Sequence, residues 1–485
     1  MNNANSNIRK AIIEASRNLD HAQSQGGHKP GFTYVPPTHA RALDLDATLV
    51  EGMRGAGKSF WWSSLSSPQH RAFINAGFPE TQLSENLIVT QGFGAGSTGP
   101  SYPDAEQLIG LQGEFRARSI WRAVVAFNAS FEGPFAKLSS WQERVHWVES
   151  NSEAFARELD ATDNRLQNES SKLLVLFDAL DRLADDWQHI RILAKGLLQV
   201  ALDMRSTRNL RCKIYIRPDM LEDDEIVSFQ DFSKLNATKA SLRWRRADLY
   251  ALLYQCLGNA SVGSEDFHKI LFECSGTSAT FKVQAPWVLP TPFRVDEDLQ
   301  ERVFQRLAGR AMGSSTKRGK PYTWLVNHLQ DGRDQVSPRS FFAALKTAAE
   351  EESVHDEFPL SYKGIQHGVQ QASNIRVIEI AEDYPWVKSV MSPLRGRLTV
   401  PCTVAEIKAI WKNDETLQNL KASLLRQGNA AKLPPQHVEQ GELGIITDLE
   451  GLGMLERLEK ERIQMPDVYR VAFGLGRRGG VKPLK

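Results

Sequence analysis

The segment from Gly52 to Ser59 limits the fold of this chain more than any other feature. It reads Gly-Met-Arg-Gly-Ala-Gly-Lys-Ser and matches in full the phosphate-binding loop pattern G-x-x-x-x-G-K-[ST]. The apolar residues 47–50 precede the loop and suit a buried strand, and residues 60–65 can continue as a helix. A strand, a glycine-rich turn and a helix form the context that the pattern requires. The sequence therefore predicts an α/β fold in which helices flank a mostly parallel sheet.

The residue types of the loop suit the phosphates of a nucleotide. Glycines allow backbone N–H groups to converge on phosphate oxygens, and the N-terminus of the following helix adds a favourable dipole. We expect Lys58 to reach the β- and γ-phosphates of ATP and the Ser59 hydroxyl to bind Mg²⁺. The alternative is a glycine turn with an incidental lysine. The predicted nucleotide contacts are Gly52, Arg54, Gly55, Ala56, Gly57, Lys58, Ser59 and Phe60.

Short apolar runs along the chain predict the other strands of the sheet. They alternate with longer helical patterns, as expected for a mostly parallel α/β sheet. The strongest strand prediction is 173–177, where all five residues are apolar. The other predicted strands are 87–90, 213–216 and 237–244, and the predicted helices include 104–129, 185–204 and 245–258.

Hydrolysis of a bound nucleotide needs acidic groups beside the loop. Asp178 directly follows the strand 173–177, and Asp181 comes three residues later. We expect Asp178 to hold the Mg²⁺ and Asp181 to orient the attacking water. Both acids also suit the first turn of a helix, and Asp181 can instead pair with Arg182.

Arg217 is a candidate for contact with the γ-phosphate. It follows the strand 213–216, which we expect to lie next to the strand that carries Asp178. An arginine at that position can sense or stabilise the charge of the phosphate. The alternative is an ion pair with Asp219 or Glu222. Arg54, inside the loop, touches phosphate in one interpretation and an adjacent subunit in the other.

Arg339 is a second candidate, at the start of a predicted helix over 338–353. Ser337 suits the N-cap and Pro338 the first helical position. An arginine in the first turn is disfavoured by the helix dipole, which points to a partner outside the helix. We expect Arg339 to reach the nucleotide from a second domain; an ordinary surface arginine is the alternative. The predicted catalytic residues are Lys58, Asp178, Asp181, Arg217 and Arg339.

Composition narrows the class of protein. The 59 basic and 58 acidic residues give a net charge of +1, so any nucleic-acid binding would have to be local. The four cysteines are widely spaced, which argues against a zinc site and a disulfide framework. We find no signal peptide and no apolar stretch long enough for a membrane span. We therefore expect a cytoplasmic protein with no membrane partner.

The chain divides into four expected segments. Residues 1–40 look like an accessory segment, 41–260 form the P-loop domain, 261–354 a helical lid or sensor domain, and 355–485 a helical and winged-helix-like domain. The last segment ends in a predicted helix at 445–459 and a hairpin that pairs 462–465 with 468–473. The basic run 476–485 is expected to be flexible and is a candidate for contact with nucleic acid.

These motifs resemble the bacterial P-loop ATPases of the additional-strand group, which includes the AAA+, STAND and KAP families. The resemblance rests on Gly52–Ser59, on the strand that ends at Asp178 and on the stretch Asp178-Ala179-Leu180-Asp181-Arg182, which is similar to a KAP segment. Ala179 departs from that segment, where KAP proteins have a second aspartate. Arg217 and Arg339 resemble the first and second sensors of the group.

The resemblance implies how such a protein works. ATPases of this group act as switches, in which nucleotide binding reshapes domain packing or drives homo-oligomer formation, and many occur in phage-defence loci. It therefore implies an Mg²⁺-dependent ATPase that controls a protein effector in antiphage defence. The alternative is a DNA-dependent ATPase that loads or remodels nucleic acid through its winged helix, and a third interpretation is a scaffold that binds nucleotide without hydrolysis.

Overall fold

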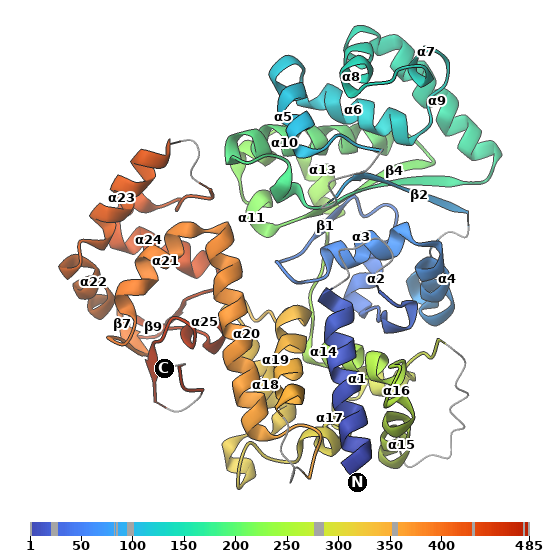
Figure 1. Ribbon diagram of the computed structural model, residues 1–485. Coiled ribbons are helices and arrows are strands. Elements are labelled where there is room, and N and C mark those ends of the chain that lie inside the picture. The colour runs from blue at the N-terminus through green and yellow to red at the C-terminus, as the bar shows by residue number, and fades with distance from the viewer. Residues whose placement is uncertain are drawn as a thin grey trace. The chain divides into compact units, whose positions relative to one another are not determined.

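The computed structural model of the protein describes residues 2–20, 28–81, 83, 86–94, 101–275, 286–351, 357–428, 432–478 and 481–483. The chain folds into two compact units (Figure 1). We call Val35–Arg243 the loop unit, because it contains the phosphate loop. The helical unit consists of Met1–Asp20, His28–Tyr34 and Trp244–Lys485.

Five parallel strands form the sheet of the loop unit, in the order β2-β3-β4-β1-β5. They are β1 (Leu49–Glu51), β2 (Leu87–Phe93), β3 (Lys172–Phe177), β4 (Leu210–Ile216) and β5 (Ala240–Ser241). Each strand overlaps one of the apolar runs that predicted it, so the parallel α/β fold is confirmed. All the apolar residues of β3 are buried, which is what a strand covered on both faces requires.

Strand β4 lies between the strand of the phosphate loop and the strand that precedes Asp178. Its residues Ile214–Ile216 pair with β1, and Leu210–Ile214 pair with β3 on the other side. The carboxyl ends of β1, β3 and β4 therefore meet at one edge of the sheet, where ligands bind in open α/β sheets.

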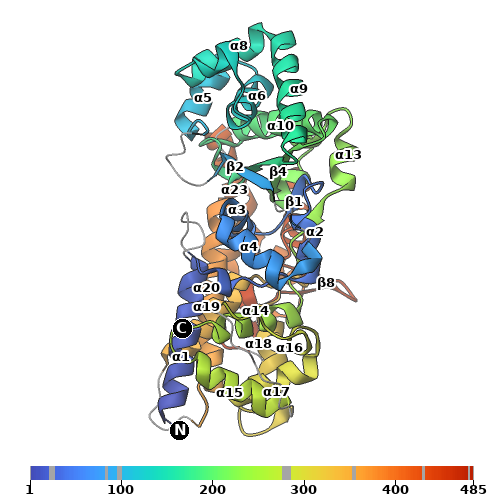
Figure 2. The same ribbon diagram turned by 90° about the vertical axis from the view of Figure 1, so that its right-hand side faces the viewer.

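Helices cover both faces of the sheet (Figures 1 and 2). On one face lie α2 (Pro37–Leu43), α3 (Lys58–Ser66) and α4 (Pro68–Gly77), and on the other α6 (Ala117–Asn128) and α10 (Trp187–Asp203). The other helices of four or more residues in the described part of the unit are α5 (Ala105–Glu114), α7 (Gly133–Ala136), α8 (Trp141–Ser150), α9 (Ser152–Asn168), α11 (Pro218–Leu221), α12 (Asp224–Val227) and α13 (Phe232–Ala237).

The predicted helix over 104–129 is in fact two helices. α5 ends where Phe115 and Arg116 become extended, and α6 begins directly after them. Gly110 and Gly113 lie in the second half of α5. Glycine loses more backbone entropy in a helix than other residues do, so these two positions favour an end to the helix nearby.

A buried lysine fixes the chain just before the phosphate-loop strand. Lys213 of β4 is fully buried, and its ammonium donates to the carbonyls of Ala42, Asp44 and Ala47 at 2.7–2.8 Å. Ala42 belongs to α2, and Ala47 lies two residues before β1. One side chain thus satisfies three backbone acceptors at the point where the chain turns from α2 into β1.

Replacement of Lys213 by methionine should destabilise the protein. The substitution keeps the volume of the side chain but leaves three carbonyls without this donor, and each unsatisfied buried group costs about 1–3 kcal/mol. We expect the free energy of unfolding in urea to fall by about 2 kcal/mol or more. Lys172→Met, at an exposed position on β3, is the matched control and should change stability little. Equal stability of the two variants would contradict this account of Lys213.

The helical unit joins the N-terminal helix to helices from much later in the chain. α1 (Asn2–Asp20) packs against α14 (Arg246–Gly258), α15 (Ser264–Ser275) and α19 (Pro338–Glu350). The unit also contains α16 (Thr291–Val295), α17 (Glu297–Ala308), α18 (Pro321–Leu329) and α20 (Tyr362–Asp383).

The division of the chain into segments 1–40, 41–260, 261–354 and 355–485 stays a prediction.

The C-terminal part of this unit is a winged-helix-like fold, as predicted. Its helices are α21 (Pro385–Met391), α22 (Val404–Asn413), α23 (Thr416–Gln427) and α24 (Gly441–Gly451). They pack with a three-stranded antiparallel sheet around one apolar core. The strands are β7 (Cys402–Thr403), β9 (Arg462–Gln464) and β8 (Glu456–Leu458), and a two-stranded sheet joins β6 (Thr399–Val400) to β10 (Gly476–Arg477).

The predicted position of the wing hairpin was wrong. The structure pairs β9 with β8, which precedes it, and forms a short helix, α25 (Asp467–Arg470), where the second strand was expected. Pro466 suits the start of that helix, because its fixed φ is close to the helical value. The turn between β8 and β9 has Lys460 and Glu461 at positive φ, where glycine is usual. The sequence therefore contained no turn signal there.

The described residues of the basic run 476–485 are packed against the fold. Arg477 lies in β10 and forms an ion pair with Asp467 at 3.1 Å. Val481 is buried, and its carbonyl accepts a hydrogen bond from the buried Arg470. The expectation of a flexible tail is therefore wrong at Arg477 and Val481, while 479–480 and 484–485 lie outside the described residues.

Candidate nucleotide-binding site

The phosphate loop joins β1 to α3 in the loop unit (Figure 1). Gly55 has φ = +79° and Gly57 has φ = +105°, a left-handed conformation that glycine adopts far more readily than other residues. Gly57 is the N-cap of α3. Its N–H group and those of the next residues lie at the positive end of the helix. The predicted order of strand, loop and helix is confirmed. Two of its glycines are explained by the path of the backbone.

The ammonium group of Lys58 folds back over the loop. It donates to the carbonyl of Gly52 at 2.6 Å and to that of Met53 at 3.1 Å. Burial lowers the pKa of Lys58 to about 8, and the nearby Asp178 carboxylate opposes that shift. The cation is thus held by backbone dipoles, and the charged form is disfavoured by lost hydration. A phosphate group would supply the counter-charge.

Ser59 and Asp178, the two predicted metal ligands, interact with each other. Asp178 is 2% exposed, and hydrogen bonding from the Ser59 hydroxyl and the Ala179 N–H acts to lower the pKa of its carboxyl group. Burial raises the pKa of Asp178, while these hydrogen bonds and Lys58 act in the opposite direction. The end of β3 and the start of α3 therefore place an alcohol and a carboxylate side by side.

This donor set fits Mg²⁺. The ion prefers oxygen ligands, and proteins usually hold it through one or two carboxylates together with substrate phosphates and water. Within the described ranges, no group of three or more His, Cys, Asp or Glu side chains could hold a metal ion. Ser59 and Asp178 thus offer the small oxygen set that Mg²⁺ takes with a nucleotide.

Asp181 and Arg217 lie near each other at the same edge of the sheet. Arg217 makes two hydrogen bonds of 2.9 Å to Asp219, and its Nη1 lies 3.6 Å from the Asp181 carboxylate. The ion-pair alternative for Arg217 is therefore present in the structure, and Asp181 takes part in it. Gly52 N–H donates to the carbonyl of Ile216 at 3.0 Å, which ties the loop to this strand end. Their roles in catalysis stay predictions.

Ala179 separates the two acids in an unusual conformation. Its φ of +57° is rare for a residue with a Cβ, and such strain is concentrated at functional sites. The turn starts a short 3-10 helix, Leu180–Arg182, which carries Asp181. The position where the sequence departs from the KAP pattern is thus the bend that separates Asp178 from Asp181.

The other predicted contacts divide between the two units. Phe60 packs edge-to-face on Trp61, with ring centroids 5.1 Å apart, and Arg54 is half-buried in the loop. Arg339 belongs to the helical unit, where Ser337 caps α19 as predicted. Its Nη1 lies 2.7 Å from Glu379 of α20, so Arg339 has an internal partner and its contact with a nucleotide stays a prediction.

Tyr215 is a buried residue near Asp178 that the sequence analysis did not single out. It is 1% exposed, it lies on β4, and Asp178 acts on it electrostatically. One signal could have found it. Arg211, Lys213 and Tyr215 alternate along a strand whose neighbours are apolar, so one face of a central strand carries polar groups.

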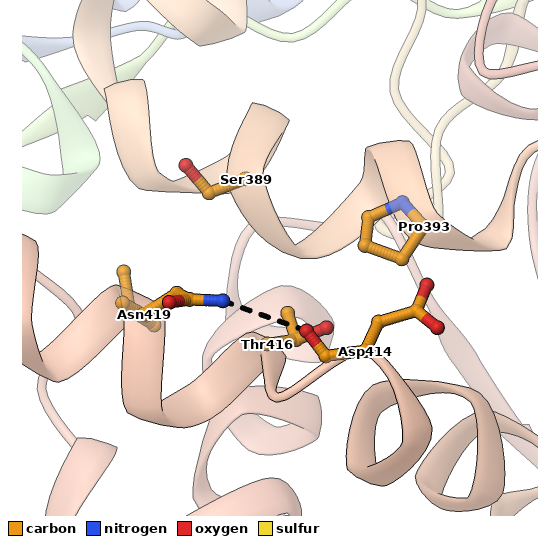
Figure 3. Close-up of a pocket in the computed structure, with 6 residues that line it drawn as sticks. Ser389, Pro393, Asp414, Thr416 and Asn419 are labelled. Atoms are coloured by element: carbon orange, nitrogen blue, oxygen red, sulfur yellow. Dashed lines mark hydrogen bonds between the residues drawn. The ribbon is translucent and has the colours of Figure 1, made fainter.

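Two cavities away from the loop are poor candidates for the nucleotide. One, of about 130 Å³, lies beside the α22–α23 turn (Figure 3) and is smaller than the 300–1,000 Å³ of typical ligand pockets. There Asn419 donates to the Asp414 carbonyl at 3.5 Å. The other, of about 370 Å³, contains no charged side chain to bind phosphate; its lining is Ser63, Ser66, Ser67, Val89, Thr90, Gln91, Ser101 and Asn128.

Comparison with known proteins finds little. No protein-family model and no curated protein matches the chain. Two solved structures are similar over most of its length: the ORC2 protein of Aeropyrum pernix, in complexes with ADPNP and ADP, at 14% identity, and Cdc6p of Pyrobaculum aerophilum, at 11%. They cover 90% and 92% of this chain and 93% of their own, with TM-scores of 0.30 and 0.28. At such scores the likeness carries no weight, and the site rests on this chain's own geometry.

Among the helices of the described residues, we find none that is long and apolar enough to cross a membrane.

Proposed function

We propose that the chain is an Mg²⁺-dependent ATPase that acts as a nucleotide-controlled switch of conformation or assembly. The observation that supports it best is the interaction between the Ser59 hydroxyl, at the end of a complete phosphate loop, and the Asp178 carboxylate. Ser59 and Asp178 are on different elements, 119 positions apart in the sequence, and the fold brings them together. An incidental glycine turn would not require a buried carboxylate beside it.

Different residues of the chain bind the phosphates, hold the ion and assist hydrolysis. Backbone N–H groups of the loop and the Lys58 ammonium bind the phosphates, and Ser59 with Asp178 would hold Mg²⁺. When bound, the ion neutralises charge on the phosphates. Asp181 orients the attacking water. Arg217, freed in part from Asp219, stabilises charge that develops on the γ-phosphate.

The switch itself is proposed to work through the helical unit. Arg339 forms an ion pair with Glu379, which lies 3.5 Å from Arg376, and Arg376 contacts Tyr469 of α25 at 3.3 Å. These contacts connect α19, α20 and the winged-helix-like part. Recruitment of Arg339 by a nucleotide would break the first of them. Control of a protein effector in antiphage defence is the process we propose for the output, on the resemblance alone.

Hydrolysis should depend on the loop lysine and the buried acid. We expect Lys58→Ala and Asp178→Asn each to lower the rate of phosphate release from Mg²⁺·ATP by about 100-fold or more, because each removes a charge that the phosphates or the ion require. Asp181→Asn should lower the turnover rate with little effect on nucleotide affinity. Lys172→Ala, at an exposed position in the same unit, is the control. Wild-type turnover in Lys58→Ala would exclude this site as the ATPase.

The oligomeric state of the protein should depend on the bound nucleotide. In light scattering, the molar mass with Mg²⁺·ATP is expected to exceed that in EDTA by roughly twofold or more, since closed homo-oligomers start at the dimer. Asp181→Asn tests whether hydrolysis reverses the change, because that variant is expected to retain its nucleotide affinity and should therefore keep any ATP-driven assembly for longer. The same mass with ATP, with ADP and without nucleotide, together with unchanged scattering profiles, would contradict the switch.

The winged-helix-like part supports one alternative, a DNA-dependent ATPase. The charges do not favour a typical docking, because α24, the helix before the wing, has three acidic and no basic residues. Any phosphate contacts would lie instead on α22 and α23, through exposed Lys412 and Arg426. This alternative requires duplex or single-stranded DNA to stimulate turnover, and Lys412→Glu with Arg426→Glu to abolish the stimulation. Truncation of 476–485 is a poor test, because Val481 and Arg477 are part of the fold.

A further inference from the structure

The hydroxyl group of Tyr215 is an unsatisfied polar group next to the proposed magnesium site. The residue is 1% exposed, and within the described ranges its hydroxyl has no hydrogen-bond partner. Buried hydroxyls in folded proteins nearly always have one, and an exception lowers stability unless a water, ion or ligand satisfies it. The hydroxyl of Tyr215 therefore needs a partner from outside the described residues, such as a water, an ion or a ligand.

The strand register places Tyr215 beside Asp178. Ile214 of β4 pairs with Phe177 of β3, and the next residues along these two parallel strands are Tyr215 and Asp178. Residues that pair across neighbouring strands direct their side chains to the same face of the sheet. The phenol and the carboxylate thus share one face.

That face is the one covered by α2 and α3. Asp178 interacts with the Ser59 hydroxyl at the start of α3. Lys213, two residues before Tyr215 and on the same face of β4, contacts the carbonyl of Ala42 in α2. Tyr215 therefore lies on the face of β4 that packs against α3, the helix that begins with the phosphate loop.

The protonation state of Tyr215 suits a neutral hydrogen-bonding role. Burial, reinforced by the charge of Asp178, raises the pKa of Tyr215 well above its usual value. The group remains a phenol, which can both donate and accept a hydrogen bond. Mg²⁺ keeps several water molecules when a protein and a nucleotide hold it, and such waters are available partners.

We propose that Tyr215 is a positioning residue of the phosphate site, whose hydroxyl gains its hydrogen-bond partner only when magnesium nucleotide binds beside Asp178. The inference rests on the proposed nucleotide binding. It explains why a central, fully buried strand position carries a tyrosine rather than a phenylalanine. The opposing interpretation is that the ring fills space and the hydroxyl is merely tolerated.

Tyr215→Phe separates these interpretations, because it keeps the ring and removes the hydroxyl. We expect the variant to raise the Tm of the ligand-free protein by about 2–4 °C, since an unpaired buried group is lost. Its Kd for a non-hydrolysable ATP analogue should rise about five- to tenfold in excess Mg²⁺, the effect of one net hydrogen bond, and stay unchanged in EDTA. Neither measurement depends on turnover.

A second tyrosine provides the matched control. Tyr254 is fully buried, and its hydroxyl donates to the carbonyl of Gln300 at 2.7 Å. Tyr254→Phe should lower the Tm and leave the Kd for the analogue unchanged, so the two variants shift the Tm in opposite directions.

Three outcomes are decisive. A lower Tm for Tyr215→Phe without ligand would overturn the inference, since the hydroxyl would then have a partner in the empty protein. An unchanged Kd in Mg²⁺ would also overturn it, while normal wild-type binding would leave the proposed function intact. Failure of the wild-type protein to bind the analogue would overturn both.

Discussion

The interaction between the Ser59 hydroxyl and the Asp178 carboxylate is the one on which the rest of this site depends. It joins the first turn of the helix after the phosphate loop to the end of the neighbouring acidic strand. The inserted strand β4 sets the distance between the two, because it pairs with β1 on one side and β3 on the other. Lys213 holds the chain that leads into β1, so the loop starts from a fixed point.

The ligand-free site is electrostatically unfavourable. Burial lowers the pKa of Lys58 to about 8 and raises the pKa of Asp178, so both charges are held where hydration is poor. Tyr215 adds a hydroxyl without a partner among the described residues. A metal ion and a triphosphate would supply partners for all three groups. Functional sites commonly lower the stability of a protein for this reason, because groups that must bind a ligand cannot also serve as hydrogen-bond or charge partners for one another.

Much of the loop unit could be predicted from the sequence, since its signals are local. The glycines of Gly52–Ser59 and the apolar run before Asp178 identify two strands and the turn between strand and helix, and no tertiary contact has to be known. Long-range features were out of reach. The pairing of Arg217 with Asp181 and the burial of Tyr215 depend on the strand order.

The helical unit was harder to predict. Its wing turn carries Lys460 and Glu461 at positive φ, where the sequence has no glycine to signal a turn. Its terminal residues are held by the buried Arg470, and no sequence pattern indicates that packing. The packing of α1 against α19 joins residues more than three hundred positions apart by the numbering of these helices, which no local pattern can indicate.

A crystal structure of the protein with Mg²⁺ and a non-hydrolysable ATP analogue tests the central claim most directly. The account predicts that the β- and γ-phosphates lie in the loop from Gly52 to Ser59. The ion should bind the Ser59 hydroxyl, and the Asp178 carboxylate should lie next to the ion. Phosphates bound at any other surface of the loop unit, with Lys58 still donating to the Gly52 and Met53 carbonyls, would contradict it.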